Sequence, residues 1–424
     1  MSDAAVVRRR LEALWHMESA KVIARLTRLL RDVGRAEELA QDTLVAALEQ
    51  WPLRGIPDNP GAWLMTTAKN RALDQLRHGK LVERKAALLA HDADLTGGGA
   101  TEEPDPDQDI ADDLLRLIFI ACHPVLSTEA RAALTLRLLG GLTPAEIARA
   151  FLTTEPTIQQ RIVRAKRTLA EAHVPFELPR ADERALRLAS VLEVLYLVFN
   201  EGYAATSGDR WLRPELCDEA LRLGRILATL IPAEAEAHGL LALMELQASR
   251  NRARVDTTGQ PVLLAAQNRA QWDRLAIGRG LHALARAESL AVPLGPYTLQ
   301  AGIAACHARA TTAGATDWIR IVALYDALSA TTPSPIVTLN RAVAVSMAYG
   351  PEAGLPLVET LRDDPRLAGY HLLPSVRGDL LEKLGRVAEA REEFARAAAL
   401  TRNEREQQLL LARMAACVES PRLN

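Results

Sequence analysis

Glutamine and basic side chains gather in one short stretch of this chain, residues 143–169. They are Gln159, Gln160, Arg161, Arg164, Lys166 and Arg167. Gln and Arg side chains form paired hydrogen bonds with adenine and guanine edges in the major groove of DNA, and Arg and Lys neutralise phosphates. The stretch therefore predicts DNA contact. A helix hairpin with an ordinary solvated basic face has the same pattern.

Two short helices are expected to position these side chains. The first begins with a capping box of Thr143 and Glu146, with Pro144 at its first position. Thr154 can cap the second helix. Apolar residues recur along that second helix at steps of four, three and four: Ile158, Ile162, Ala165 and Leu169. One face is thus buried and the other presents Gln and Arg, as in a helix-turn-helix with its recognition helix.

The composition limits where nucleic acid can bind. The 424 residues carry a formal net charge of −2, with 49% hydrophobic and 25% charged residues. Any DNA contact must therefore be local, because a protein that coats DNA is basic throughout. No segment is long and apolar enough to suggest a membrane span, so a cytoplasmic location is expected.

Four widely spaced cysteines form no CxxC pair, which favours a reducing compartment and argues against structural zinc. They are Cys122, Cys217, Cys306 and Cys417. The adjacent pairs Cys122–His123 and Cys306–His307 make poor chelates, because neighbours on a helix point about 100° apart. No metal and no cofactor are expected.

Apolar residues recur with helical period almost everywhere, so an all-α fold is predicted. Helices are expected over residues 4–16, 21–33, 36–50 and from Gly61 onward, with a loop at 51–60. The third of these helices carries an acidic stripe of Glu38, Asp42 and Glu49, with Gln41 beside it. Such a stripe is either a solvated face or a docking surface for a basic partner.

The domain boundaries follow changes in composition. Residues 91–113 contain nine acidic residues, no Lys or Arg, and three successive glycines, and this predicts a flexible acidic linker. It separates a module at 1–90 from a helix-turn-helix module at 114–175. Beyond the boundary at 174–179, residues 180–424 are expected to form a helical solenoid. Its break glycines Gly314, Gly350 and Gly385 lie 36 and 35 residues apart, near the tetratricopeptide period of ~34.

Residues 10–173 resemble the two-domain core of an extracytoplasmic-function (ECF, group IV) sigma factor. The segment AEELAQDTLVAALEQW looks like sigma region 2.1–2.2, AWLMTTAKNRALDQLRHGK like region 2.3–2.4, and TPAEIARAFLTTEPTIQQRIVRAKRTL like region 4. The later segments VLYLVFNEGYAAT, GPYTLQAGIAACHA and SPIVTLNRAVAV resemble the extension of a subgroup that fuses a tetratricopeptide-like domain to this core.

The resemblance implies a role for each candidate residue. Base edges of the −35 element would be contacted by Gln159, Gln160, Val163 and Arg164, with Arg161 and Lys166 on phosphates. The loop 53–60 and the helix after it would meet the −10 element, through Asn70, Arg71 and Arg77. Trp63 is either a stacking residue there or a core residue. The acidic face of Glu38, Gln41 and Asp42 would dock on the clamp helices of the largest subunit of core RNA polymerase, with the polymerase flap as a further contact.

The resemblance thus implies promoter recognition without catalysis, together with a regulatory C-terminal domain that binds a protein or a ligand. The alternative is an ordinary helix-turn-helix regulator with a tetratricopeptide sensor domain, but it leaves residues 36–78 without a role. An enzyme interpretation would have to start from Glu201, Tyr203, His238 or His307. None of these lies in a nucleophile elbow, a phosphate loop or a metal-ligand spacing.

Overall fold

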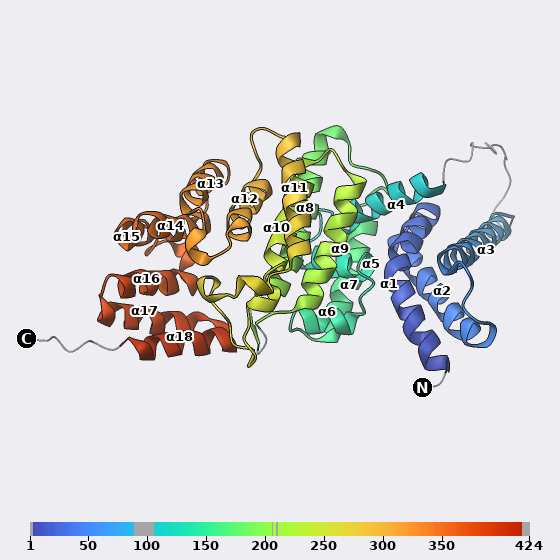
Figure 1. The fold of residues 1–424 in the computed structure, drawn as a ribbon. Coiled ribbons are helices and arrows are strands. Elements are labelled where there is room, and N and C mark those ends of the chain that lie inside the picture. Colours follow the sequence, from blue (N-terminus) through green and yellow to red (C-terminus); the bar gives the residue numbers. More distant parts are fainter. Residues whose placement is uncertain (1–2, 89–105, 206, 209–210, 418–424) are drawn as a thin grey trace, which may run out of the picture. The chain divides into compact units, whose positions relative to one another are not determined.

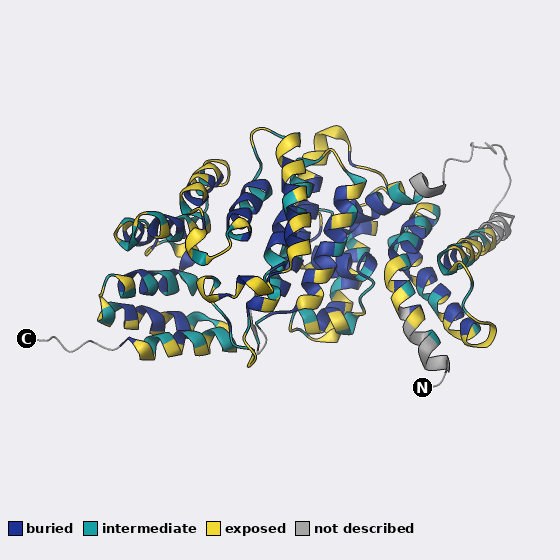
Figure 2. Cartoon of the chain, viewed as in Figure 1, coloured by how far each residue is buried: buried dark blue, intermediate teal, exposed yellow. Residues whose placement is uncertain are grey.

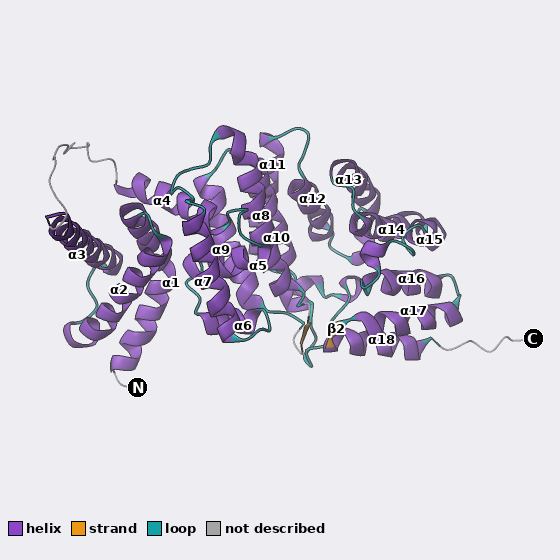
Figure 3. Ribbon diagram, turned by 180° about the vertical axis from the view of Figure 1, so that it is seen from behind, coloured by secondary structure: helices purple, strands orange, loops and turns teal. Residues whose placement is uncertain are grey.

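Helices dominate the computed structural model, which describes residues 3–88, 106–205, 207–208 and 211–417 (Figures 1 and 3). Within these residues the strands are β1 (Ser207–Gly208) and β2 (Arg402–Asn403), which pair in parallel. The prediction of an all-α fold is confirmed. The chain divides into two compact units, residues 1–194 and 195–424, and each is described by itself.

The first unit consists of seven helices and the beginning of an eighth, counted over its described residues. They are α1 (Asp3–Leu30), α2 (Val33–Arg54), α3 (Pro60–Leu88), α4 (Pro106–Ala121), α5 (Thr128–Leu138), α6 (Pro144–Ala150), α7 (Glu155–Glu171) and α8 (Ala181–Tyr203). Helix α1 packs against α2, α3 and α4. The helices expected at 4–16 and 21–33 are joined in one α1, because residues 17–20 include no glycine or proline to end a helix. Helix α1 ends at Leu30, earlier than predicted, and Val33 already belongs to α2.

The loop expected at 51–60 is shorter in the structure. Helix α2 continues to Arg54 and ends at Gly55, whose φ of 85° suits glycine and whose N–H donates to the carbonyl of Trp51. Helix α3 then begins at Pro60, and the side chain of Asn59 accepts a hydrogen bond from the amide of Ala62 at 3.1 Å. Only five residues, 55–59, therefore separate the two helices.

The expected acidic linker is also shorter than predicted. Helix α4 begins at Pro106, so residues 106–113 are helical, and residues 91–105 lie outside the described residues. Asp113 is fully buried and lies within 3.3 Å of Arg25 and 3.6 Å of Arg28, both on α1. The acidic end of the expected linker thus packs onto the first module through ion pairs, which composition alone does not reveal.

The boundary expected at residues 174–179 is displaced as well, because the first turns of α8 belong to the first unit. Arg187 donates to the carbonyl of Phe119 at 2.9 Å, and Ser190 donates to the carbonyl of Cys122. Arg131 of α5 donates to Glu193 at 3.0 Å. The division between the units therefore falls inside α8, after Val194.

The second unit comprises the end of α8 and the helices up to residue 416. They are α9 (Pro214–Leu230), α10 (Ala235–Ala248), α11 (Arg274–Leu290), α12 (Pro296–Arg309), α13 (Trp318–Thr331), α14 (Pro335–Tyr349), α15 (Pro351–Glu359), α16 (Leu372–Lys383), α17 (Val387–Leu400) and α18 (Glu404–Ala416). Short 3₁₀ turns lie at Asn251–Ala253, Leu264–Ala266, Arg269–Gln271, Ala313–Ala315 and Pro365–Leu367.

Consecutive helices of this unit share a succession of small cores. One lies among α10, α11 and α12, the next among α12, α13 and α14, and the last extends from α14 to α18. Figure 2 shows buried residues along these helices. Gly350 and Gly385 have φ of 98° and 75° and connect α14 to α15 and α16 to α17. Neighbour-to-neighbour packing is typical of a solenoid, while the tetratricopeptide assignment stays a prediction.

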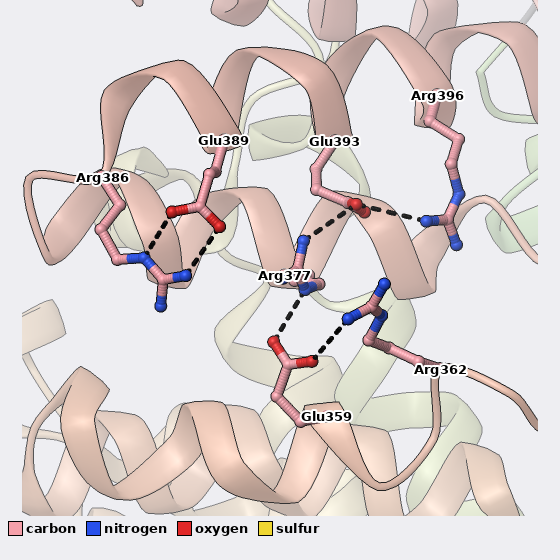
Figure 4. A network of polar contacts seen from close by, with 7 residues as sticks. All are labelled: Glu359, Arg362, Arg377, Arg386, Glu389, Glu393 and Arg396. Carbon is pink, nitrogen blue, oxygen red and sulfur yellow. Dashed lines mark hydrogen bonds and ion pairs between the residues drawn. The ribbon is translucent and has the colours of Figure 1, made fainter.

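An ion network ties α15, α16 and α17 together (Figure 4). The buried guanidinium of Arg377 on α16 donates to Glu359 at 2.8 Å and to Glu393 of α17 at 3.0 Å. Arg362 and Arg396 pair with the same two carboxylates at 3.4 and 3.2 Å. A buried charge is tolerated only with such partners, so Arg377 fixes the register of three helices. No helix in the described part of the chain is long and apolar enough to cross a membrane.

Candidate nucleic-acid interface

Helices α6 and α7 form the helix-turn-helix that the sequence predicts. The capping box is complete: the Thr143 hydroxyl accepts from the amide of Glu146, and the Glu146 carboxylate accepts from the amide of Thr143 at 2.8 Å. Thr154 caps α7 by accepting from the amide of Thr157. Leu152, with φ of 48°, makes the turn between the helices.

The two faces of α7 differ as the apolar spacing predicts. Its apolar positions are all buried, and α7 packs against α5 and α6. These positions are Ile158, Ile162, Ala165 and Leu169. Gln159, Gln160, Val163 and Arg164 are exposed, and Val163 keeps 62% of its surface in solvent. A row of Gln, Val and Arg on an open helix face can meet base edges, because Val contacts thymine methyl groups while Gln and Arg bind purines.

The two residues assigned to phosphates are only partly exposed. Lys166 forms an ion pair with the carboxylate of Glu37 on α2, and Arg137 of α5 donates to that same carboxylate through Nε at 2.5 Å. Arg161 faces Glu129 of α5. The pKa of Glu129 is lowered first by its own backbone amide and the hydroxyl of Ser127, and its burial opposes this; the charge of Arg161 lowers it further.

The residues assigned to the −10 element lie along α3. Asn70 and Arg77 are exposed and Arg71 is half-buried. Arg77 lies 3.5 Å from Asp74, an exposed pair of little strength. Trp63 is half-buried, and its ring packs edge-on against the buried ring of Trp51 with centroids 5.4 Å apart. Packing thus holds Trp63 in place while part of its ring stays open to solvent.

The residues assigned to polymerase binding lie on α2. Glu38 and Asp42 are exposed, whereas Gln41 is half-buried. Gln41 lines a cavity of about 760 Å³, whose other walls include Arg137 and Glu146 of the second module. The cavity and the Glu37 ion pair both lie within the first unit. In this structure the face beside the acidic stripe is therefore close to the helix-turn-helix module.

Two carboxylates important to the site were missed by the sequence analysis. Glu37 is only 5% exposed, and Asp113 is fully buried between α4 and α1. Both hold basic residues of distant helices, which lie from 85 to 129 positions away in the sequence. Local spacing carries no signal for such pairs. In the sequence, the one indication that Glu37 is buried is its place between Ala36 and Leu39 on the apolar side of α2.

Comparisons with known protein families match three successive parts of the chain. Residues 14–81 match sigma-70 region 2, and residues 116–169 match sigma-70, region 4. Residues 187–288 match a family of unknown function (DUF6596). Both matched regions lie within residues 10–173, the part of the chain that resembles the two-domain core of an ECF sigma factor. No solved structure matches the chain.

Individual relatives agree with these matches. An uncharacterized protein (R00370) of Rhizobium meliloti (strain 1021) is 46% identical over 385 residues, which cover 90% of this chain and 89% of that protein. The ECF RNA polymerase sigma factor SigK of Mycobacterium ulcerans (strain Agy99) is 32% identical over 154 residues, which cover 35% of this chain and 78% of that protein. SigL of Mycobacterium tuberculosis (strain ATCC 25618 / H37Rv) is 29% identical over 171 residues, 40% of this chain and 92% of that protein. The likeness to SigK of Mycobacterium ulcerans, together with the matches to sigma-70 regions 2 and 4, shows that the chain belongs to the ECF-type sigma factors, and it belongs to the same family as the Rhizobium meliloti protein.

Proposed function

We propose that this sigma factor binds core RNA polymerase, recognises −10 and −35 promoter elements through two separate helical surfaces, and is regulated by its C-terminal helical domain. The observation that carries the proposal is the division of α7 into two faces. Four buried apolar residues anchor the helix, and the exposed side keeps Gln159, Val163 and Arg164 available to base edges.

At the −35 element, Arg164 is the residue best suited to read a base. It is exposed, and a guanidinium can bind the O6 and N7 atoms of guanine together. Gln159 donates to Glu155 at 3.0 Å in the free protein and would exchange that exposed bond for one to a base. Lys166 would reach a phosphate only after leaving Glu37.

At the −10 element, α3 supplies the contacts. Asn70 and Arg77 are exposed along the helix, and Arg71 is half-buried beside them. A base turned out of the duplex costs a few kcal/mol, which stacking on an aromatic ring together with phosphate contacts can offset. Trp63 supplies such a ring, because packing on Trp51 fixes its orientation without burying it completely.

Polymerase binding is assigned to α2 and the helix-turn-helix module. The exposed carboxylates of Glu38 and Asp42 suit a basic surface such as the clamp helices of the largest subunit, and the flap would contact the second module. An ordinary repressor with a sensor domain would need no region 2. The sigma-70 region 2 match over residues 14–81 therefore argues against that alternative.

The −35 assignment is tested by binding titrations on promoter variants with polymerase present. Arg164→Ala should cost about 1–3 kcal/mol, confined to one base pair, because it removes a base contact. Lys166→Ala should weaken binding equally on all sequences. Arg184→Ala, at another exposed arginine outside α7, is the matched control and should change nothing. Equal losses on every sequence for Arg164→Ala would refute the base contact.

The regulatory role rests on covalent attachment, which keeps the C-terminal domain at high effective concentration around the sigma regions. Removing the domain tests it, but the cut must spare α8, since Arg187 and Ser190 pack onto the first unit. A chain ending after Tyr203 that still binds core polymerase should show altered promoter activity in reconstituted transcription. Activity equal to that of the full chain would exclude regulation by this domain.

A further inference from the structure

A basic groove lies in the second unit between α9, α10 and α11. Its volume is about 500 Å³, which is within the range of small-molecule sites. The charged and polar side chains that line it are Arg225, Thr229, His238, Glu245, Arg279, His282 and Arg286. Every lining residue falls inside residues 187–288, the part that matches a family of unknown function.

One buried carboxylate organises the basic side chains. Glu245 is 1% exposed and accepts hydrogen bonds from Arg225 at 2.6 and 2.8 Å and from Arg279 at 3.0 and 3.1 Å. The side chains of Arg225 and Arg279 themselves remain 45% and 49% exposed. Glu245 therefore fixes the two guanidiniums in position and leaves each of them open to the groove.

The third guanidinium is also held in place. Arg286 Nη2 donates to the carbonyl of Pro232 at 3.2 Å, and His238 Nε2 lies 3.2 Å from the same oxygen. Three arginines and the single carboxylate Glu245 line the groove, while Asp218 and Asp273 lie near Arg225 and Arg279 without lining it. Guanidiniums in fixed orientations bind carboxylate and phosphate groups through two parallel hydrogen bonds.

A glycine of α11 lines the groove. Gly278 lies inside α11, and a Cβ added there would meet nothing within 4 Å, so helix packing does not require glycine at this position. At Gly280, two residues on, a Cβ would come within 2.7 Å of Leu246. Glycine inside a helix costs about 0.5–1 kcal/mol relative to alanine. No close contact at Gly278 offsets this cost. The glycine leaves free space beside Arg279.

We propose that this groove binds a small organic dianion, either a phosphate monoester or a dicarboxylate. Its negatively charged groups meet Arg279, Arg225 and Arg286, and its carbon body lies on the apolar side chains of Leu241 and Ala283. Such a ligand would be the signal that the C-terminal domain senses. Binding of this ligand can be measured without DNA or polymerase. Its test is therefore independent of the test of promoter recognition.

Calorimetric titration of the full chain tests this proposal. The probes are glucose 6-phosphate and succinate, each compared with a partner lacking the double charge, glucose and butyrate. At least one dianion should bind, and at least tenfold more tightly than its partner. Arg286→Gln should weaken that binding about tenfold, because it removes one charge-assisted contact.

Gly278→Leu provides the second test, since it fills the groove while leaving every charge in place. It should abolish the binding, and Ala285→Leu, at an exposed position of the same helix outside the groove, should not. Melting curves identify any variant that fails to fold. The proposal is overturned if neither dianion binds, if glucose or butyrate binds equally well, or if a folded Gly278→Leu protein binds as the wild type does.

Discussion

Lys166 of the recognition helix α7 and Glu37 of α2 form an ion pair, so a residue assigned to promoter DNA is occupied by region 2 in this structure. Arg137 of α5 shares the Glu37 carboxylate. If Lys166 contacts promoter phosphate as proposed, this ion pair must break when the protein binds DNA. The proposal therefore predicts that the Glu37 carboxylate competes with DNA phosphate for Lys166.

Replacing Glu37 should shift that competition. In Glu37→Gln, the free protein should bind a −35 duplex about fivefold more tightly, a gain of ~1 kcal/mol, because Lys166 no longer has a carboxylate partner. The same change should lower the free energy of unfolding by about 1–3 kcal/mol, since a buried partner is lost. Fluorescence anisotropy and chemical denaturation measure the two effects.

The neighbouring Glu38→Gln is the matched control, because it removes the same charge from an exposed position of the same helix. It should leave duplex binding of the free protein within a factor of two. A rise of equal size in both variants would show that net charge alone is responsible. Weaker binding in Glu37→Gln would contradict the competition directly.

Asp113 should be a main contributor to the stability of the first unit. It is fully buried and pairs with Arg116 at 2.8 Å and with two arginines of α1. Asp113→Asn removes the buried carboxylate that these three arginines share and should cost about 3–5 kcal/mol. Asp112→Asn, one residue earlier and half-exposed, should have little effect. Denaturant melts of both proteins measure these losses in the free energy of unfolding. Equal losses in the two variants would refute the special role of the buried Asp113.

Arg377 should be equally important to the second unit. Arg377→Gln removes the partner shared by Glu359 and Glu393 and should destabilise the unit by about 3 kcal/mol. The exposed pair of Arg386 and Glu389, also drawn in Figure 4, supplies the control. Arg386→Gln should leave the melting temperature unchanged, and a shift as large as that of Arg377→Gln would contradict the role of burial.

Stability should fall in mild acid because of His307. Burial, with the nearby charges of Arg250 and Arg269, lowers the pKa of this imidazole to about 4. The unfolded chain takes up a proton near pH 6.5 and the folded protein only near pH 4, so unfolding binds a proton between these values. The free energy of unfolding should therefore decline as pH falls from 6.5 to 4.

Removing the titrating group should flatten this decline. His307→Phe keeps a ring against Trp318, which packs edge-on at 5.1 Å, and should show a shallower pH slope over that interval. His78→Gln, at an exposed histidine, should keep the wild-type slope. Denaturation series at half-unit pH steps provide the comparison. An unchanged slope in His307→Phe would show that other groups cause the acid loss.

Local patterns predicted much of the first unit. The capping residues Thr143 and Thr154 and the apolar steps from Ile158 to Leu169 locate α6 and α7, because both signals depend only on near neighbours. Ends of helices were less predictable. Proline at position 52 suggested a stop, yet α2 continues to Arg54 and is ended by Gly55. A proline near the end of a helix disrupts few backbone hydrogen bonds, so Gly55 and not Pro52 determines where α2 ends.

Contacts between distant residues account for what the sequence did not predict. Composition marked residues 106–113 as linker, but Asp113 finds its partners on α1 and the segment becomes helix. Glu37 was hidden for the same reason, because Lys166 lies 129 positions away. The basic groove also depends on a contact between helices, because the buried Glu245 of α10 holds Arg225 of α9 and Arg279 of α11. Tertiary pairing of charges has no periodic signature, so only the structure could identify these sites.

The most direct measurement is transcription in vitro with purified core RNA polymerase on genomic DNA, followed by mapping of the start sites. The wild-type protein should direct initiation at a defined set of sites that share −10 and −35 sequences. Arg164→Ala should reduce initiation selectively, according to the base at one −35 position. If the protein starts no transcript on any template while binding core enzyme, or if Arg164→Ala reduces all start sites equally, promoter recognition through α7 is contradicted.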